Sequence, residues 1–110
     1  MMIGVATTVI VGIICIILGA TNIKGNISSI HTYHRYRVKE EDKLPFGKLM
    51  GIGTIIIGIG IILQGIAILL SDLLKNEVFT LIGIPLLFLS IIAGLIICVY
   101  AMKKYNGGIF

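Results

Sequence analysis

The sequence predicts an all-α membrane protein with three transmembrane helices, at about residues 3–22, 49–71 and 79–102. The first observation is composition: of 110 residues, 57% are hydrophobic and only 13% are charged, against roughly a quarter charged in a soluble domain. Mean hydropathy is +1.10. A soluble globular domain is excluded because it could not keep this much apolar surface from water. The length predicts a single domain, residues 1–110.

The second observation is where the charges fall. Three runs carry no charged side chain: residues 1–23, 49–71 and 78–102, which are 23, 23 and 25 residues long. At about 1.5 Å per residue, a helix of this length spans the roughly 30 Å hydrocarbon core with some tilt. Strands of a membrane barrel would alternate apolar and polar residues, which the run Ile55-Ile56-Ile57 does not. We therefore expect helices.

The distribution of lysine and arginine predicts the orientation. The first loop, 24–48, holds six basic residues and the C-terminal tail holds two, whereas the second loop, 72–77, holds only Lys75. The positive-inside rule then predicts a multi-pass protein of the plasma membrane with its N-terminus outside and its C-terminus in the cytoplasm. The first apolar run has no basic residue before it and is long for a signal peptide, so we expect it to be retained as a span.

Small and polar residues recur along the first and third spans at helical spacing. At about 100° per residue they gather on one face of each span. The face of the first span holds Gly4, Thr8, Gly12, Cys15, Gly19 and Asn22, and that of the third holds Thr80, Gly83, Ser90, Gly94, Cys98 and Ala101. Because small residues let helices approach closely in a membrane, each of these spans is predicted to have one packing face.

The second span has two such faces. One holds Gly51, Thr54, Gly58 and Gly65, and the opposite one holds Gly53, Gly60, Gln64, Ala67 and Ser71. We therefore predict that the second span lies between the other two. Self-association is the alternative use of one face, because the pair Gly51-x-Gly53 is repeated seven residues later as Gly58-x-Gly60. Such a repeat favours a continuous contact between helices. The predicted helix-packing residues are Gly12, Gly19, Gly51, Gly53, Gly58, Gly60, Gln64, Gly65, Ser90 and Gly94.

Gln64 is the only amide deep within a span. It could contact a permeant species, but an interhelical hydrogen bond is the favoured interpretation.

The first loop contains a candidate interfacial helix. Apolar residues and His34 share one arc of residues 23–38, with cations on its flank, as in a helix lying on anionic lipid. His31-x-x-His34 could also bind a metal with nearby carboxylates, but the spacing is a weak motif and no metal site is predicted. A second short helix is expected through residues 39–42, ending before Pro45. The residues expected to contact lipid headgroups or a partner are Lys24, His31, His34, Arg35, Arg37 and Lys39.

No span contains Asp, Glu, Lys, Arg or His. Proton-coupled transport normally requires an ionisable group at membrane depth, and catalysis requires a perturbed acid, base or nucleophile in a dry pocket. We therefore expect no catalytic residues and no cofactor. The loop has a net charge of only +3, and its aromatic residues match no nucleic-acid-binding module, so lipid headgroups are the expected partner.

The stretch from Ile30 to Lys43, followed by Gly47-Lys48-Leu49-Met50-Gly51 at the start of a span, resembles a family of small three-span membrane proteins of Gram-positive bacteria with no assigned function. That resemblance implies a source and a topology but no mechanism. The loop also resembles that of membrane-spanning immunity proteins, which protect against secreted toxic peptides.

Three functions are expected from these observations. The first is a non-catalytic membrane protein that acts through partners, with immunity to a membrane-active peptide or an accessory role as concrete forms. The second is a holin-like pore former that assembles as a homo-oligomer. The third is an accessory subunit of a transporter, whose membrane protein partner supplies the polar residues.

Overall fold

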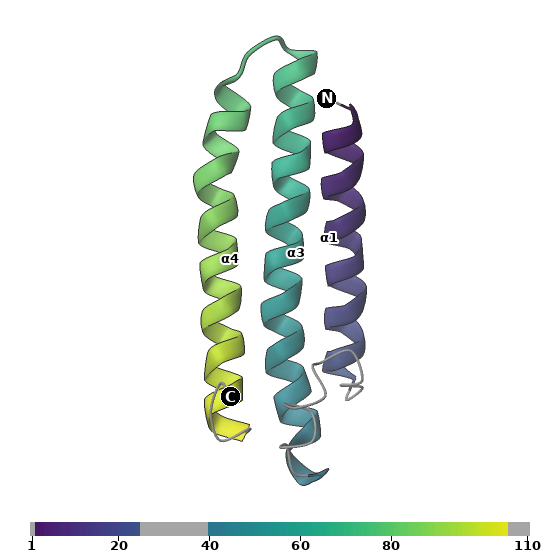
Figure 1. Cartoon of the computed structure of the whole chain (residues 1–110), viewed down its shortest axis with the longest axis vertical. Coiled ribbons are helices and arrows are strands. Elements are labelled where there is room, and N and C mark those ends of the chain that lie inside the picture. Colours follow the sequence, from purple (N-terminus) through teal and green to yellow (C-terminus); the bar gives the residue numbers. More distant parts are fainter. Residues whose placement is uncertain (1, 25–39, 106–110) are drawn as a thin grey trace.

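A computed structural model describes residues 2–24 and 40–105 of the chain, and the described part is helical with short turns and no strand. It contains α1 (Met2–Ile23), the short 3-10 helix η1 (Glu40–Asp42), α3 (Lys43–Leu73) and α4 (Val78–Tyr105) (Figure 1). The three α-helices are 22, 31 and 28 residues long. Each is long and apolar enough to cross a membrane, as the sequence predicted.

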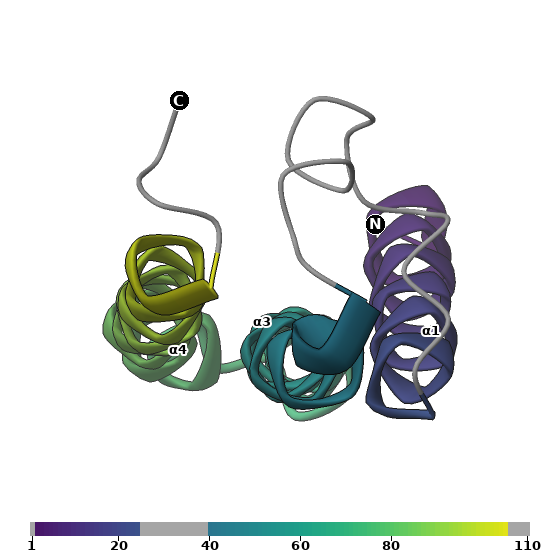
Figure 2. The ribbon, with the colours of Figure 1, turned by 90° about the horizontal axis from the view of Figure 1, so that it is seen from below.

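The helices lie side by side in a row with α3 in the middle (Figures 1 and 2). In the described part of the chain, α3 packs extensively against both α1 and α4, whereas α1 and α4 make no substantial contact with each other. The prediction that the second span lies between the first and third is therefore confirmed. The start of α1 and the α3–α4 turn lie at one end of the row, and the end of α4 lies at the other (Figure 1).

The start of the second span corrects the sequence prediction. We expected a short helix to end before Pro45 and the span to begin at residue 49. Instead, η1 leads directly into α3, which begins at Lys43 and includes Pro45 as its third residue. Proline is tolerated there because the first-turn N–H groups of a helix have no intrahelical acceptor.

The predicted interfacial helix falls mainly on residues 25–39, outside the described part of the chain.

At the other end of the chain, α4 continues past the predicted residue 102 to Tyr105. It also passes through the exposed Pro85. Pro85 lacks an N–H, so the helix loses the bond that this group would donate to the Leu81 carbonyl. Transmembrane helices tolerate such a loss.

The α3–α4 turn is closed by backbone and side-chain caps. Lys75 has a positive φ of 53°, and the Asn76 N–H donates to the Ser71 carbonyl at 3.0 Å. The Lys75 N–H donates to the Asp72 carbonyl at 3.4 Å. These two bonds make a Schellman motif with a lysine at the position where glycine is usual. The Asn76 side-chain oxygen then accepts from the Val78 N–H at 3.1 Å and starts α4.

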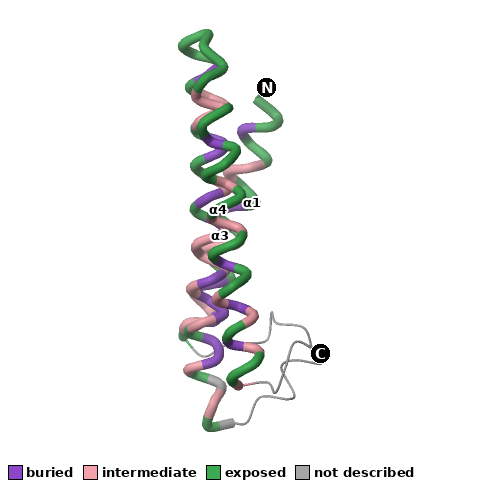
Figure 3. Tube along the Cα trace, turned by 90° about the vertical axis from the view of Figure 1, so that its left-hand side faces the viewer, coloured by how far each residue is buried: buried purple, intermediate pink, exposed green. Residues whose placement is uncertain are grey.

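A small hydrophobic core lies where the start of α3 meets the end of α4. Phe46, Met50, Cys98 and Ala101 are buried together; Leu49, Met102 and Tyr105 are partly buried against them. Phe46 is fully buried although it precedes the charge-free run of α3. Buried stretches gather toward this end of the row (Figure 3). Because Phe46 lies outside the run predicted to cross the hydrocarbon core, its burial is expected to gain from the hydrophobic effect, which lipid does not supply.

Candidate functional site

The α1–α3 interface is built on reciprocal pairs of glycines. A Cβ atom added at Gly12 would lie 2.8 Å from the Gly58 carbonyl oxygen, and one added at Gly58 would lie 2.8 Å from that of Gly12. Gly19 and Gly51 face each other in the same way, with 2.6 Å from a Cβ at Gly19 to the Gly51 oxygen. Real Cβ atoms essentially never come within 3.0 Å of a neighbour. The two backbones are therefore at a distance that only glycine permits.

Polar side chains also lie at this interface, beside the isoleucines that flank the glycine pairs. Thr8 lies against Gly65, where an added Cβ would overlap its hydroxyl oxygen. That hydroxyl donates to the Val5 carbonyl of its own helix at 2.9 Å, so it is not free to line a polar path. Asn22 is buried at the other end of α1.

The α3–α4 interface repeats the glycine pairing once. A Cβ at Gly53 would lie 2.7 Å from the Gly94 carbonyl oxygen, and one at Gly94 would lie 2.5 Å from that of Gly53. Ser90 packs against Gly60, where an added Cβ would overlap the serine Cβ. The Cys98 thiol donates to the Met50 carbonyl oxygen at 3.9 Å. Small residues thus bring α4 close to α3, as they bring α1.

Gln64 is accommodated by a glycine on the facing helix. Its side chain is 8% exposed, and a Cβ at Gly83 would overlap the glutamine Oε1. Oε1 is buried without a hydrogen-bond partner in the described residues. The predicted interhelical hydrogen bond is therefore not made by this oxygen. The amide instead lies against Gly83, which the Ala67 side chain also approaches.

One pair of hydroxyl side chains links α3 to α4 near their turn. The Ser71 Oγ accepts from the Thr80 N–H at 2.8 Å and from the Thr80 hydroxyl at 2.7 Å. The other bonded hydroxyls of the spans donate to carbonyls of their own helix, as Thr54 does to Met50 at 2.8 Å and Ser90 does to Leu86 at 2.9 Å. This satisfies polar groups locally rather than presenting them to a permeant species.

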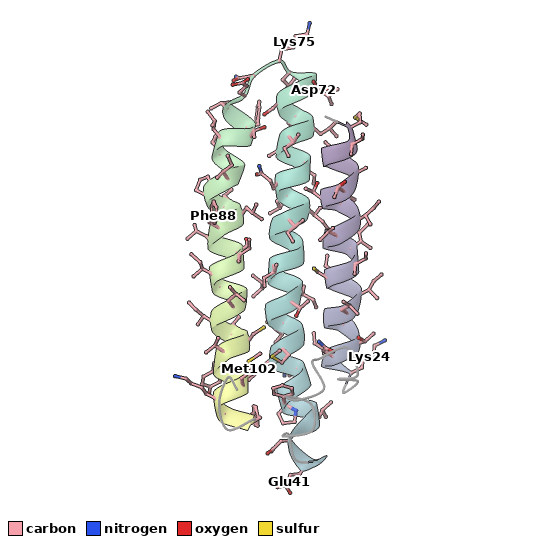
Figure 4. All side chains as sticks on the ribbon, in the orientation of Figure 1. Lys24, Glu41, Asp72, Lys75, Phe88 and Met102 are labelled. Carbon is pink, nitrogen blue, oxygen red and sulfur yellow. The ribbon has the colours of Figure 1, made fainter. Side chains whose placement is uncertain are left out.

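All ten predicted packing residues lie at one of the two interfaces. The prediction that Gly4 lies on the packing face of α1 is wrong, because a Cβ there would have no neighbour within 4 Å. Of the six residues expected to contact headgroups or a partner, Lys24 is exposed directly after α1 (Figure 4). The other five lie outside the described residues.

The end of the molecule with the C-terminus of α4 carries several exposed cations. Lys24, Lys48, Lys103 and Lys104 are all exposed there. The Lys104 Nζ lies 5.7 Å from the ring centre of Tyr100 and 5.3 Å from that of Tyr105. Lysine and tyrosine side chains of this kind suit the headgroup level, where a cation and an aromatic ring can both contact lipid.

The opposite end has a cavity that sequence reasoning missed. It has a volume of about 630 Å³ and is lined by Ile68, Ser71, Asp72, Lys75, Asn76, Glu77, Thr80 and Leu81. The three charges within the second loop were visible in the sequence. Nothing local showed that α3 and α4 place them around one hollow.

In the described residues, no group of three or more His, Cys, Asp or Glu side chains could hold a metal ion. The His31-x-x-His34 motif lies outside the part of the chain to which this applies.

Comparison with known protein families, curated proteins and solved structures finds no match to this chain. The resemblance to a Gram-positive three-span family therefore stays a prediction.

Proposed function

We propose that this chain is a non-catalytic protein of the plasma membrane that acts by binding partners, and that immunity to a membrane-active peptide is its concrete role. In this proposal the N-terminus and the α3–α4 turn lie outside the cell. The opposite end, which carries Lys24, Lys48, Lys103 and Lys104 and is called the basic end, lies in the cytoplasm against anionic lipid. The positive-inside bias supports that orientation.

The observation that carries the proposal is how the two interfaces are filled. Glycine pairs close the α1–α3 and α3–α4 contacts, and the bonded hydroxyls are largely satisfied within their own helices. The charge-free runs supply no titratable group apart from cysteine and tyrosine. A row of helices packed in this way is suited to binding other molecules at its surface rather than to moving protons or ions through its centre.

The row also leaves large surfaces for a partner. The outer helices α1 and α4 each contact only α3 extensively among the described elements. Large apolar side chains such as Phe88 and Ile92 on α4 are more than half exposed. Figure 4 labels Phe88 on this helix. In a membrane these faces meet lipid or another transmembrane helix. The same free flanks support the holin-like alternative, in which copies of the chain associate into a pore.

The experiment is induced expression in a Gram-positive host that is challenged with cationic membrane-active peptides. Immunity predicts a higher inhibitory concentration of at least one peptide, with an unchanged membrane potential before the challenge. Gly58→Leu is the matched control, because its side chain would meet the Gly12 backbone and separate α1 from α3; this variant should not protect.

Two other outcomes would reject the immunity proposal. Loss of membrane potential or lysis on induction alone would favour the holin-like pore. Stoichiometric copurification with a transport protein, without any protection, would favour the accessory subunit. Flux of protons or potassium in liposomes of the purified chain would contradict the absence of intrinsic transport if it were saturable and coupled to a gradient.

A further inference from the structure

The cavity at the α3–α4 turn is lined by charges of both signs. The side chains of Asp72, Lys75 and Glu77 are exposed around it. Within the described residues, none of these carboxylates and ammonium groups comes within 4.0 Å of an opposite charge. Lys75 and Asp72 both lie at this end of the row, far from the basic end (Figure 4). The three charged residues therefore line the cavity without neutralising one another.

The walls of the cavity change from polar to apolar along the helices. Ile68 lies within the charge-free run of α3 and Leu81 within that of α4, whereas the charged residues lie between the two runs. Because these runs match the hydrocarbon core, the charged rim lies at the level of the lipid headgroups and the apolar wall lies at the level of the first acyl carbons. The backbone around it is held by the Ser71–Thr80 hydrogen bonds.

We propose that this cavity binds the headgroup of a phospholipid that carries a primary ammonium group, of the phosphatidylethanolamine class. The lipid ammonium donates to the carboxylates of Asp72 and Glu77, and the lipid phosphate accepts from the Lys75 ammonium. A primary ammonium has three N–H donors, whereas the quaternary ammonium of phosphatidylcholine has none. The site therefore distinguishes these two zwitterions by hydrogen bonding and not by net charge.

A cationic peptide fits the cavity less well than a zwitterion. Lys75 repels a second positive charge, and the cavity side chains carry a net charge of only −1 from two carboxylates and one ammonium. An anionic lipid headgroup would meet the two carboxylates unfavourably. The inference goes beyond the proposed function and does not depend on it, because it holds whichever partner the protein binds and whichever way the chain faces.

The test is native mass spectrometry of the purified full chain with phosphatidylethanolamine, phosphatidylcholine or phosphatidylglycerol of identical acyl chains. We expect phosphatidylethanolamine to bind about tenfold more tightly than phosphatidylcholine, which corresponds to about 1.4 kcal/mol. The double variant Asp72→Asn/Glu77→Gln should lose that preference. Lys75→Gln should weaken both zwitterionic lipids by similar factors, because they share the phosphate.

The matched control is Lys103→Gln, which removes one exposed cation at the opposite end and should leave the preference unchanged. Because all the substituted residues are exposed, the variants should keep the wild-type elution volume and helical circular dichroism. Equal binding of the three lipids, tightest binding of phosphatidylglycerol, or a preference that survives in the double variant would overturn the proposal. Saturable binding of a lysine-rich peptide at this end, without displacement of any bound lipid, would also overturn the proposal.

Discussion

Replacing Gly53 by alanine tests whether close backbone approach holds α3 to α4. The added Cβ would lie 2.7 Å from the Gly94 carbonyl oxygen and 2.7 Å from the Cys98 sulfur, whereas ordinary contact begins at 3.4 Å. The helices must therefore separate locally by about 0.7 Å, because a helical carbonyl cannot rotate away. A gap of 0.5–1 Å forfeits roughly a quarter to a half of the dispersion energy of each affected atom pair.

The matched control is Gly4→Ala, because a Cβ at Gly4 meets nothing within 4 Å. Both substitutions replace a helical glycine by alanine. This replacement by itself stabilises a helix by about 1 kcal/mol. That gain is common to the two variants, so their difference reports the clash. Overpacking of a tight interface costs about 1–3 kcal/mol, and we expect Gly53→Ala to be less stable than Gly4→Ala by this amount.

The assay is SDS-induced unfolding in mixed micelles, with pulse labelling of the buried Cys98 thiol by a maleimide in a Cys15→Ala background. Gly60→Ala gives a second reading of the same interface, because its Cβ would overlap Ser90 and not touch the labelled cysteine. Equal stability of the Gly53, Gly60 and Gly4 variants would refute the reasoning, since glycine contacts would then not determine the packing.

Three further predictions concern orientation, the turn and Gln64. A cysteine at Ser29 should resist an impermeant maleimide in intact cells and one at Asn76 should react; the reverse pattern would invert the topology. Lys75→Gly should raise the free energy of unfolding by about 1 kcal/mol, because the positive φ of 53° suits glycine better; a loss of stability in the same SDS titration would contradict this. Gly83→Ala should destabilise by about 1–3 kcal/mol through overlap with the Gln64 amide, and Gln64→Ala should rescue it in a double-mutant cycle; additive effects would show that the two residues do not interact.

The spans and their order could be predicted because the information is periodic and local. Charges are confined between the runs, and glycines seven residues apart stay on one side of a helix. Gly51 and Gly58 therefore share one face of α3, while Gly53 and Gly60 share another. Two small faces on one helix require two neighbours, which places α3 in the middle.

Helix ends and side-chain partners were less predictable. The sequence predicts a helix end before Pro45, but the effect of a proline depends on whether it occupies the first turn of a helix, and packing decides where that turn begins. Phe46 extends α3 because it is buried against Cys98 and Ala101, which lie about fifty residues further along the chain. No local pattern around Phe46 reports that distant contact.

The sequence by itself determined that this chain is helical, that three of its helices are long and apolar enough to span a membrane, and that small residues pack them. Lipid imposes length, charge exclusion and close backbone approach on any helix that crosses it. The tertiary structure alone decided which glycines face each other, that Gln64 lies against Gly83, and that Asp72, Lys75 and Glu77 surround one cavity. These features depend on the register of one helix against another. That register is set by the sum of many contacts between distant residues, and no single segment of the sequence contains it.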